Sequence, residues 1–432
     1  MSEGTIGLLG LCVLLLLVFL RMPIGLAMLL VGFWGFALLG GIGGALNNLD
    51  AVPYRYVADF TFAVIPLFLL MGSVAAKGGI SEDLYKAAYA WVGRLRGGLA
   101  MATVWATAGF AAICGSSTAT AAGIGKIAYP EMKKFNYDAR LATGSIAAGG
   151  TMGILIPPSL GFVTYAILTE QSIGKLFMAG IIPGILEAVF YVVTIWIVCR
   201  LNPELGPPGT RVPLGAKFAS LKGVWSMIVL FLLVMGGIYA GIFTPTEAAG
   251  VGASGAIVVG LLKRRLDKAT FIESLADSCR STAVIFLLIV GAMVFQRFIA
   301  ISNLPFRLAD LIAGLGLSRY AILSLILLFY IFAGCFMDIF SCLVLTIPII
   351  YPTILSLGFD PIWFGVLFVR VAEIGLITPP IGMNCFVVAG TTGVPLGAVF
   401  RGIVPFFLAD LAHVALLVAF PEISLFLPNM MG

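Results

Sequence analysis

The stretch Gly149-Gly-Thr-Met-Gly-Ile-Leu-Ile-Pro-Pro-Ser159 places glycines and a Pro-Pro pair inside an otherwise apolar run. A similar stretch, Glu373-Ile-Gly-Leu-Ile-Thr-Pro-Pro-Ile-Gly382, lies nearer the C-terminal end. Proline removes a backbone donor and clashes with the preceding turn, so a regular helix cannot continue through either stretch. In hydrocarbon, the freed backbone groups are tolerated only where they face protein or a watery cavity. We therefore predict two broken membrane helices that build a binding site.

The composition is that of a polytopic membrane protein. The chain has 432 residues, of which 61% are hydrophobic and 10% charged, and its mean hydropathy is +1.11. A span needs about 20 apolar residues, so the apolar segments suffice for roughly ten to twelve spans. The net charge of +5 is spread over loops without a basic, aromatic-rich patch, so we expect no nucleic-acid partner. The seven cysteines lack metal-ligand spacing, which favours a packing role.

The charge pattern predicts the orientation in the membrane. The basic linker at 201–223 and the basic cluster at 263–268 are separated by two spans, so they share a side, which the positive-inside rule identifies as the cytoplasm. The apolar run 6–20 follows no basic leader and precedes no cleavage site, so we interpret it as a retained first span. The polar stretch 47–59 and the amphipathic stretch 78–98 are expected at the interface.

The chain also contains an internal repeat. Sliding the chain along itself until the two Pro-Pro pairs coincide produces eight identities in a single register. They are Pro130 on Pro352, Asp138 on Asp360, Gly153 on Gly375, Pro157 and Pro158 on Pro379 and Pro380, Thr169 on Thr391, Gly180 on Gly402, and Pro183 on Pro405. So many identities in one register indicate two related halves.

Each half contains an apolar segment that is interrupted before the broken helix. The interruptions, Cys114 to Thr120 and Phe336 to Cys342, occupy corresponding positions and predict two re-entrant hairpins. On the expected topology the hairpins enter from opposite sides, which is the inverted-repeat plan of secondary transporters. We therefore expect an all-α membrane protein with a first half at 1–200, a cytoplasmic linker at 201–223, a central scaffold helix pair at 224–268 and a second half at 269–432.

The hairpin tips carry the first candidate ligands. Gly115, Ser116, Ser117 and Thr118 offer hydroxyls, carbonyls and a helix N-terminus at membrane depth, which suit an anion or an oxygen-liganded cation such as sodium. Small-residue helix packing is the alternative. Asp338 is the acid of the second tip, and a carboxylate within a span costs ~3 kcal/mol. It would position a cation or orient the tip through hydrogen bonds to the backbone, unless it is only an exposed residue at a hairpin end.

Two arginines lie inside apolar runs. A guanidinium fork suits a substrate carboxylate, so Arg297 and Arg370 are both candidates, and the sequence does not rank them. Glu373 follows Arg370 by three residues and would pair with it on one helix face. Glu247, after a Thr-Pro-Thr sequence, is expected to cap a helix start. His413, the single histidine, is expected to be a buried ring with a satisfied hydrogen bond.

These residues resemble the motifs of the large membrane (M) subunit, DctM-like, of the tripartite ATP-independent periplasmic (TRAP) transporters. The resemblance covers nearly the whole chain. It rests on the two Pro-Pro stretches, the second continuing to Asn384, on Ser172 to Phe177 with Ala179-Gly180 and Pro183-Gly184, and on Phe243-Thr-Pro-Thr-Glu-Ala-Ala249.

The resemblance implies a sodium-driven importer of small organic acids, such as C4-dicarboxylates, sugar acids or sialic acid, in the bacterial inner membrane. It implies two partners, a periplasmic substrate-binding protein (P) and a small four-helix membrane subunit (Q). It also implies an elevator-type fold, in which a transport domain with both hairpins and both broken helices moves against a scaffold.

The same resemblance carries over candidate ligands by position. Those for sodium are Gly115, Ser116, Ser117, Thr118, Gly149, Gly153 and Pro157 in one half, and Gly334, Asp338, Gly375, Thr378, Pro379 and Gly382 in the other. Those for substrate, expected between the tips, are Ser116, Ser117, Pro158, Arg297, Asp338, Arg370 and Asn384. The chain departs from the family pattern before Glu373, where Arg370 and Val371 replace an apolar residue and an asparagine.

Two alternative functions remain at this point. One is a self-sufficient sodium/dicarboxylate carrier that needs no binding protein. The other is an intramembrane hydrolase, which would need a base near Ser116 or Ser159, and His413 is its single histidine candidate.

Overall fold

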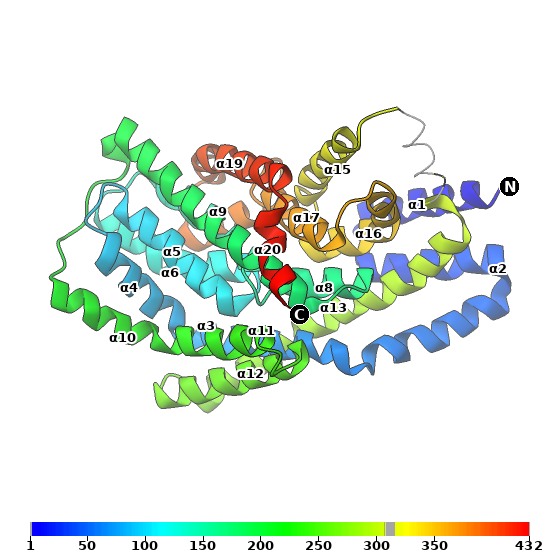
Figure 1. Cartoon of the computed structure of the whole chain (residues 1–432), viewed down its shortest axis with the longest axis horizontal. Coiled ribbons are helices and arrows are strands. Elements are labelled where there is room, and N and C mark those ends of the chain that lie inside the picture. The colour runs from blue at the N-terminus through cyan, green and yellow to red at the C-terminus, as the bar shows by residue number, and fades with distance from the viewer. Residues whose placement is uncertain (1, 306, 308–315, 432) are drawn as a thin grey trace.

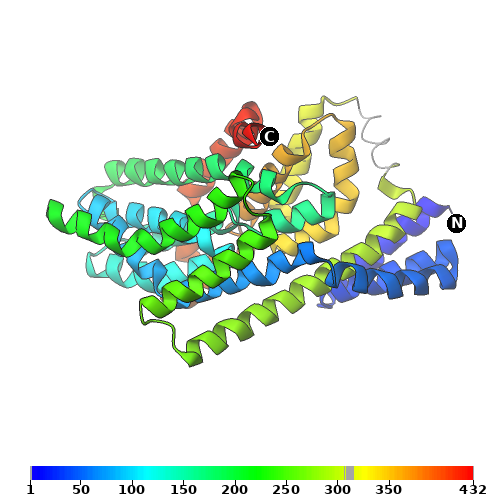
Figure 2. The same ribbon diagram turned by 60° about the horizontal axis from the view of Figure 1, so that its bottom comes forward.

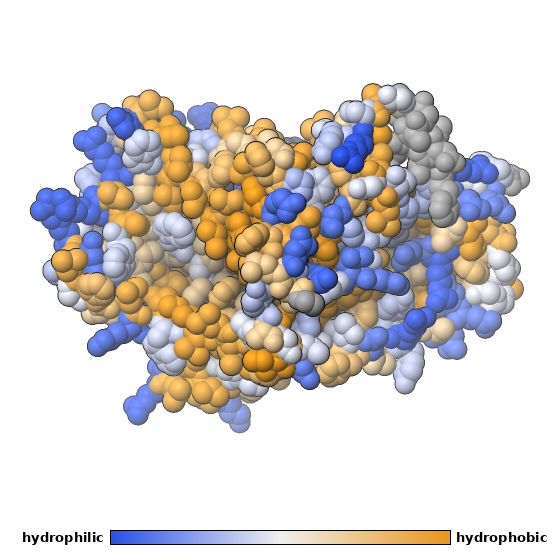
Figure 3. All heavy atoms as spheres, in the orientation of Figure 1, coloured by the Kyte–Doolittle hydropathy of each residue, from blue (hydrophilic) through white to orange (hydrophobic). Residues whose placement is uncertain are grey.

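The computed structural model describes residues 2–305, 307 and 316–431, and the described part consists of helices and loops without a strand. Within these described residues, eight helices are long and apolar enough to cross a membrane, or nine if one bent pair counts as a single span. The expected ten to twelve spans also counted apolar segments that form helices of 10 to 17 residues, which are too short to span alone. Hydrophobic side chains cover much of the surface in Figure 3, as lipid contact requires.

The N-terminal helices form an elongated part of the molecule (Figures 1 and 2). They are α1 (Glu3–Phe19), α2 (Ile24–Val57) and α3 (Val64–Lys77), with the 3-10 turn Phe60–Ala63 before α3. The polar stretch 47–59, expected at the interface, is helical as far as Val57, beyond a kink at Gly41. Asn48 and Val52 are buried, so one face of this segment packs on protein.

The middle of the chain supplies α4 (Ile80–Val92), α10 (Leu214–Phe231), α11 (Gly237–Tyr239), α12 (Pro245–Leu262) and α13 (Lys268–Ile301), with a π-helical turn Leu232–Gly236 before α11. α13 packs along α2 and α3. The second part of the linker is already helical, because α10 begins at Leu214. The capping prediction for Glu247 is confirmed, because Thr244 and Glu247 form a reciprocal capping box at the start of α12.

The remaining helices form two series of similar order. The first series is α5 (Gly98–Cys114), α6 (Ser117–Lys134), α7 (Ala139–Leu155), α8 (Leu160–Thr169) and α9 (Ile173–Leu201). The second is α15 (Arg319–Gly334), α16 (Ile339–Ser356), α17 (Pro361–Gly375), α18 (Met383–Thr392) and α19 (Leu396–Ala419), followed by α20 (Glu422–Met430).

Helix starts in the two series follow the register of the sequence repeat. When Pro157 is superposed on Pro379, the first residue of α6 falls on the first residue of α16, and the first residue of α7 falls on that of α17. α18 and α19 each start one position later than their counterparts α8 and α9 would place them. The register found in the sequence therefore coincides with helix boundaries, whereas the opposite orientation of the halves stays a prediction.

The core lies around α7 and α17. Every residue from Leu141 to Leu155 on α7 and from Ile362 to Gly375 on α17 is buried. A helix that is buried all round belongs to the interior. α7 and α8 are bent by 41° at the first Pro-Pro pair, and the second pair lies between α17 and α18. The two predicted helix breaks are therefore present. Pro157 and Pro158 at the first break are buried, whereas Pro379 and Pro380 at the second are exposed.

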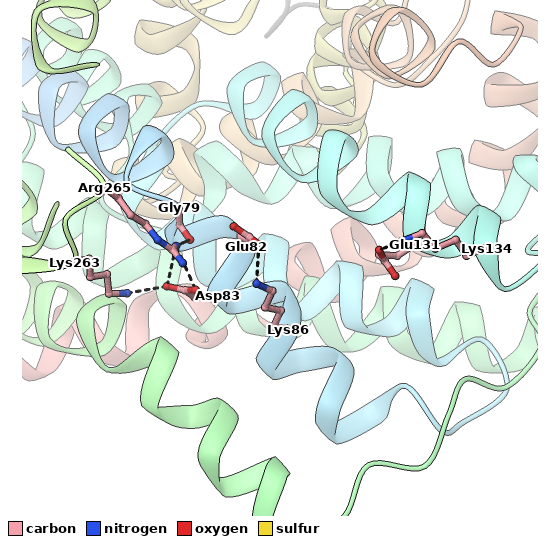
Figure 4. A network of polar contacts seen from close by, with 8 residues as sticks. All are labelled: Gly79, Glu82, Asp83, Lys86, Glu131, Lys134, Lys263 and Arg265. Carbon is pink, nitrogen blue, oxygen red and sulfur yellow. Dashed lines mark hydrogen bonds and ion pairs between the residues drawn. The ribbon is translucent and has the colours of Figure 1, made fainter. Parts of the chain in front are cut away.

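A network of charged side chains joins α4 to the turn after α12 (Figure 4). Asp83 of α4 accepts from Lys263 at 2.8 Å, and Arg265 lies 3.4 Å from the same carboxylate. Lys263 also donates to the carbonyl of Gly223 and the hydroxyl of Ser226, both on α10. Three helices are thus tied together at one point.

Candidate functional site

The first hairpin tip lies against the first helix break. Ser116 is the N-cap of α6, and Gly115 before it has a φ of +64°, which glycine adopts without strain. A Cβ on Gly115 would lie 3.1 Å from the carbonyl oxygen of Pro158. A Cβ on Gly153 would lie 2.7 Å from the carbonyl oxygen of Ser116. The structure therefore brings these predicted ligands together, with carbonyl and hydroxyl oxygens at the junction.

The second tip lies against the end of α17. A Cβ on Gly334 would lie 2.6 Å from the carbonyl oxygen of Ala372 and 3.1 Å from Gly375. Half-buried Asp338 is the N-cap of α16 and accepts from the backbone N–H groups of Phe340 at 3.0 Å and Ser341 at 3.2 Å, as well as from the Ser341 hydroxyl. Asp338 therefore orients this tip through backbone hydrogen bonds, one of the two roles expected of it.

A buried hydrogen bond joins the two halves. The hydroxyl of Ser117, at the first tip, lies 2.6 and 2.7 Å from the two carboxylate oxygens of Glu373 on α17, and both residues are buried. Asn384 of α18 is fully buried near Gly150 of α7, and neither atom of its side-chain amide has a partner within the described residues. Polar groups from both halves thus meet in the interior.

The remaining predicted ligands also lie at the breaks. Gly149 on α7 is close to Thr107 of α5, since a Cβ there would lie 3.0 Å from its hydroxyl. Thr378 follows α17 and donates to the carbonyl of Ile374 at 2.6 Å. Pro157 and Pro379 begin the two Pro-Pro pairs, and Gly382, with a φ of +60°, precedes α18.

Arg370 does not pair with Glu373, contrary to one of the two interpretations of its position. It is fully buried and pairs with Glu187 of α9 at 3.1 Å and with Asp410 of α19, and its Nε donates to Nδ1 of His413 at 3.0 Å. Although Arg370 and Glu373 are one helical turn apart, Glu373 meets the hairpin tip whereas Arg370 meets α9 and α19. His413 is a buried ring with a hydrogen-bond partner, as expected.

Arg297 lies in a different place from the hairpin tips. It lines a cavity of about 530 Å³ between α13, the end of α2 and the turn from α8 to α9. Arg55, Glu170 and Gln171 also line this cavity. Neither Arg55 nor Arg297 forms an ion pair within the part of the chain that the structure describes. On the predicted topology this cavity faces the outside.

Sequence reasoning missed Glu187 and Asp410. Each is an acid inside a long apolar helix, and an ionisable residue inside a span is by default a functional hypothesis, so that rule would have found both. Their partner Arg370 lies on a different helix from either acid and far from both in the sequence, so the pairing itself had no local signal.

Comparison with known proteins identifies a family. The family model described as "Tripartite ATP-independent periplasmic transporter, DctM component" matches residues 11–423. The chain is 38% identical to the C4-dicarboxylate TRAP transporter large permease protein DctM of Pseudomonas aeruginosa, over 91% of this chain and 94% of that one. It is 32% identical to the sialic acid TRAP transporter large permease protein SiaM of Vibrio cholerae, over 96% of each.

One solved structure is similar in fold. The YdaH transporter of Alcanivorax borkumensis, described as having an unusual topology, matches with a TM-score of 0.60 over 93% of this chain and 98% of that one. The two sequences are 14% identical, so this likeness concerns the fold alone.

Proposed function

Since the chain belongs to the DctM component family of the tripartite ATP-independent periplasmic transporters, we propose that it is the large permease of a sodium-coupled importer of a small organic acid. It is a multi-pass protein of the bacterial inner membrane and a transporter component rather than an enzyme. The hydrolase interpretation is therefore set aside. His413, its base candidate, is engaged with Arg370.

The observation that carries the proposal is the meeting of two hairpin tips with two helix breaks. The oxygens of Ser116, Ser117 and Pro158 at the first junction suit a hard monovalent cation such as sodium. Asp338 would supply a charged oxygen at the second junction. The Ser117 to Glu373 hydrogen bond supports the idea that the two junctions respond to each other.

The solute is proposed to be a carboxylate. The names of the Pseudomonas and Vibrio relatives give C4-dicarboxylate and sialic acid as their solutes, and both are organic acids. The solute would lie between the tips, within reach of Ser116, Ser117, Pro158, Asp338 and Asn384. Since Arg370 already faces two carboxylates, we propose that Arg297 is the guanidinium that meets the solute. Arg297 lines a cavity away from the tips, so this contact would precede binding between them.

Two partners follow from the family. The proposed assembly contains a periplasmic substrate-binding protein (P), which delivers the solute, and a small four-helix membrane subunit (Q). We propose that transport is an elevator motion, with α5–α9 and α15–α19 moving against a scaffold that includes α2, α3, α12 and α13. The packing of α13 along α2 and of α12 along α3 supports this division.

Uptake into liposomes tests the proposal. Vesicles that contain this chain and its small membrane partner would receive an inward sodium gradient, with the binding protein added or omitted, and labelled succinate, a sugar acid or sialic acid as solute. We expect uptake of one of them that requires both sodium and the binding protein.

Two results would contradict the proposal in different ways. Sodium-driven uptake without the binding protein would identify a self-sufficient carrier. Uptake that is unchanged when sodium is replaced by potassium would exclude sodium coupling.

A further inference from the structure

The interior holds a second group of polar side chains that the proposed ion and solute sites do not use. It consists of Glu187 on α9, Arg370 on α17, and Asp410 and His413 on α19, and we name it the Arg370 cluster. All four side chains are fully buried. They hold three helices together in the core of the molecule.

Arg370 makes the contacts that define the cluster. Its Nη1 lies 3.1 Å from Oε1 of Glu187, its Nη2 donates to Oδ1 of Asp410, and its Nε donates to Nδ1 of His413 at 3.0 Å. The other carboxylate oxygens, Oε2 of Glu187 and Oδ2 of Asp410, have no hydrogen-bond partner within the described residues, and neither has Nε2 of His413. Each carboxylate therefore keeps one buried oxygen that is free to carry a proton.

The charges of the cluster do not balance. Two carboxylates face one guanidinium, which stays protonated in proteins. The imidazole cannot supply the missing positive charge, because its Nδ1 accepts a hydrogen bond from Arg370 and the ring is therefore neutral. One negative charge is left over in a place without solvent. An uncompensated charge in a protein interior is strongly unfavourable.

Neighbouring groups do not remove the imbalance. Within the described residues, the ion pairs of Glu187 and Asp410 are those with Arg370. α7 contributes Thr151, whose hydroxyl lies 2.8 Å from Oε1 of Glu187 and 3.0 Å from the hydroxyl of Tyr191 on α9. Glu373, one turn along α17, adds a further carboxylate, and Glu422 of α20 is exposed. None of these groups is a cation.

We propose that the Arg370 cluster is a proton-binding site, which holds one proton on the unpaired oxygen of Glu187 or of Asp410. The proton makes the buried group neutral without a metal ion, and no trio of histidine, cysteine and acidic residues in the described chain is arranged to hold one. The site joins α9 and α19 to α17, the helix whose next turn carries Glu373 to the hairpin tip. Loss of the proton at alkaline pH therefore loosens the helices that position the transport site.

Thermal unfolding of the purified full-length chain in detergent, measured from pH 6 to pH 10, tests the proposal without relying on transport. Carboxylates of an unfolded chain are ionised near pH 4, so above that pH the folded protein holds one more proton than the unfolded chain. Its folding constant then falls about tenfold for each pH unit until the proton leaves. Asp410→Asn and Glu187→Gln each remove the charge that the proton neutralises. We therefore expect the folding constant of both variants to fall less steeply with pH than that of the wild-type chain, by about a factor of ten for each pH unit.

The matched control is Asp138→Asn. Asp138 caps α7 outside the membrane helices, where hydrogen bonding from Arg140 lowers the pKa of its carboxyl. This variant should keep the wild-type slope. If the two cluster variants do not fold, infrared spectra of the Asp138 control and of the wild-type chain at pH 7 and pH 10 still test the idea. The carbonyl band of a protonated carboxylic acid should be present at pH 7 and lost at high pH. It should persist in Glu373→Gln, which removes the buried carboxyl of α17.

The outcomes separate this proposal from the transport function. A wild-type chain without an alkaline fall, or cluster variants that retain the full wild-type slope, would overturn the proton site. So would the absence of a pH-dependent carboxylic-acid band. A failure of sodium-driven uptake would instead contradict the proposed transport and leave these unfolding results unaffected.

Discussion

At the residue scale, the contribution of a buried charge to protein stability depends on whether its oppositely charged partners are present. Breaking a buried ion pair by removing one member costs about 3–5 kcal/mol, whereas replacing all members together is often neutral. Arg370 meets Glu187 and Asp410 with no solvent around it. A structural role for Arg370 and a role in binding the solute therefore predict different results when the whole set is replaced.

Arg370→Gln is expected to reduce membrane abundance and the melting temperature, because Glu187 and Asp410 stay buried without a cation. The triple variant E187Q/R370Q/D410N removes all three charges and should restore abundance to near the wild-type level. Quantitative immunoblots and thermal unfolding measure both effects. Solute uptake by the triple variant would show that Arg370 acts by positioning helices. A well-folded triple variant without uptake would instead show that transport requires the charged groups of the cluster and not only the packing of its helices.

The Asp338→Asn variant keeps the helix cap at the second tip but removes its charge. Asn caps a helix about as well as Asp, so abundance should be unchanged. Loss of a charged ligand weakens a contact by about 1.5–3 kcal/mol, so half-saturating sodium should rise about tenfold or more. Sodium titration of uptake measures this. Asp360→Asn, which caps α17 through Ile362 and Trp363, is the matched control. An unchanged sodium requirement in Asp338→Asn would remove this residue from the proposed cation site.

At the element scale, the tips fit the breaks because backbones approach with no side chain between them. A Cβ on Gly153 would meet the carbonyl oxygen of Ser116 at 2.7 Å, and in the other half a Cβ on Gly375 would meet Gly334 at 2.5 Å. Gly153 and Gly375 occupy the same position of the repeat. Each half therefore seats its hairpin on a glycine of its own broken helix.

Gly153→Ala should displace the first tip, since the obstructing atom is backbone and cannot rotate away. Overpacking of this kind costs about 1–3 kcal/mol, so we expect a lower melting temperature together with reduced sodium-dependent uptake. Gly390→Ala on α18 is the control, because its Cβ meets no atom within 4 Å. Equal uptake by the two alanine variants would show that the seat of the hairpin tolerates movement.

At the scale of the whole molecule, α4 connects α5 of the first hairpin to α10 and α12. α4 packs on α5 and on α10, and Asp83 ties it to Lys263 and Arg265 in the turn after α12 (Figure 4). The side chains of Asp83 and Lys263 are 13% and 15% exposed, so solvent screens this pair weakly. The same helix carries Glu82 and Lys86, which form a more exposed pair.

Asp83→Asn should destabilise the protein by about 1–3 kcal/mol, because Lys263 and Arg265 lose a largely buried charged acceptor. Glu82→Gln on the same helix removes an exposed pair and should cost less than about 0.5 kcal/mol. Thermal unfolding of both variants in one detergent compares them directly. If Glu82→Gln lowers the melting temperature as much as Asp83→Asn does, the network around Asp83 does not hold α4 in place.

Much of the local architecture could be predicted from the sequence. The Pro-Pro pairs predicted both helix breaks, and the small residues from Gly115 to Thr118 predicted the first tip. The partners of the buried polar residues could not be predicted, because they depend on which neighbouring helix each side chain faces. Glu373 and Arg370 are one turn apart, a spacing that favours an ion pair between them. In the structure Glu373 instead contacts Ser117 of α6, and Arg370 pairs with Glu187 of α9.

The sequence by itself therefore determined the broken helices, the hairpins and the register of the repeat, because proline, glycine and hydrophobicity act through the backbone over a few residues. Only the tertiary structure decided the partners of the buried polar groups. Ser117 and Glu373 are 256 residues apart, and Arg370 joins three helices. A buried charge pairs with the oppositely charged group that helix packing places next to it, and that packing depends on the whole chain.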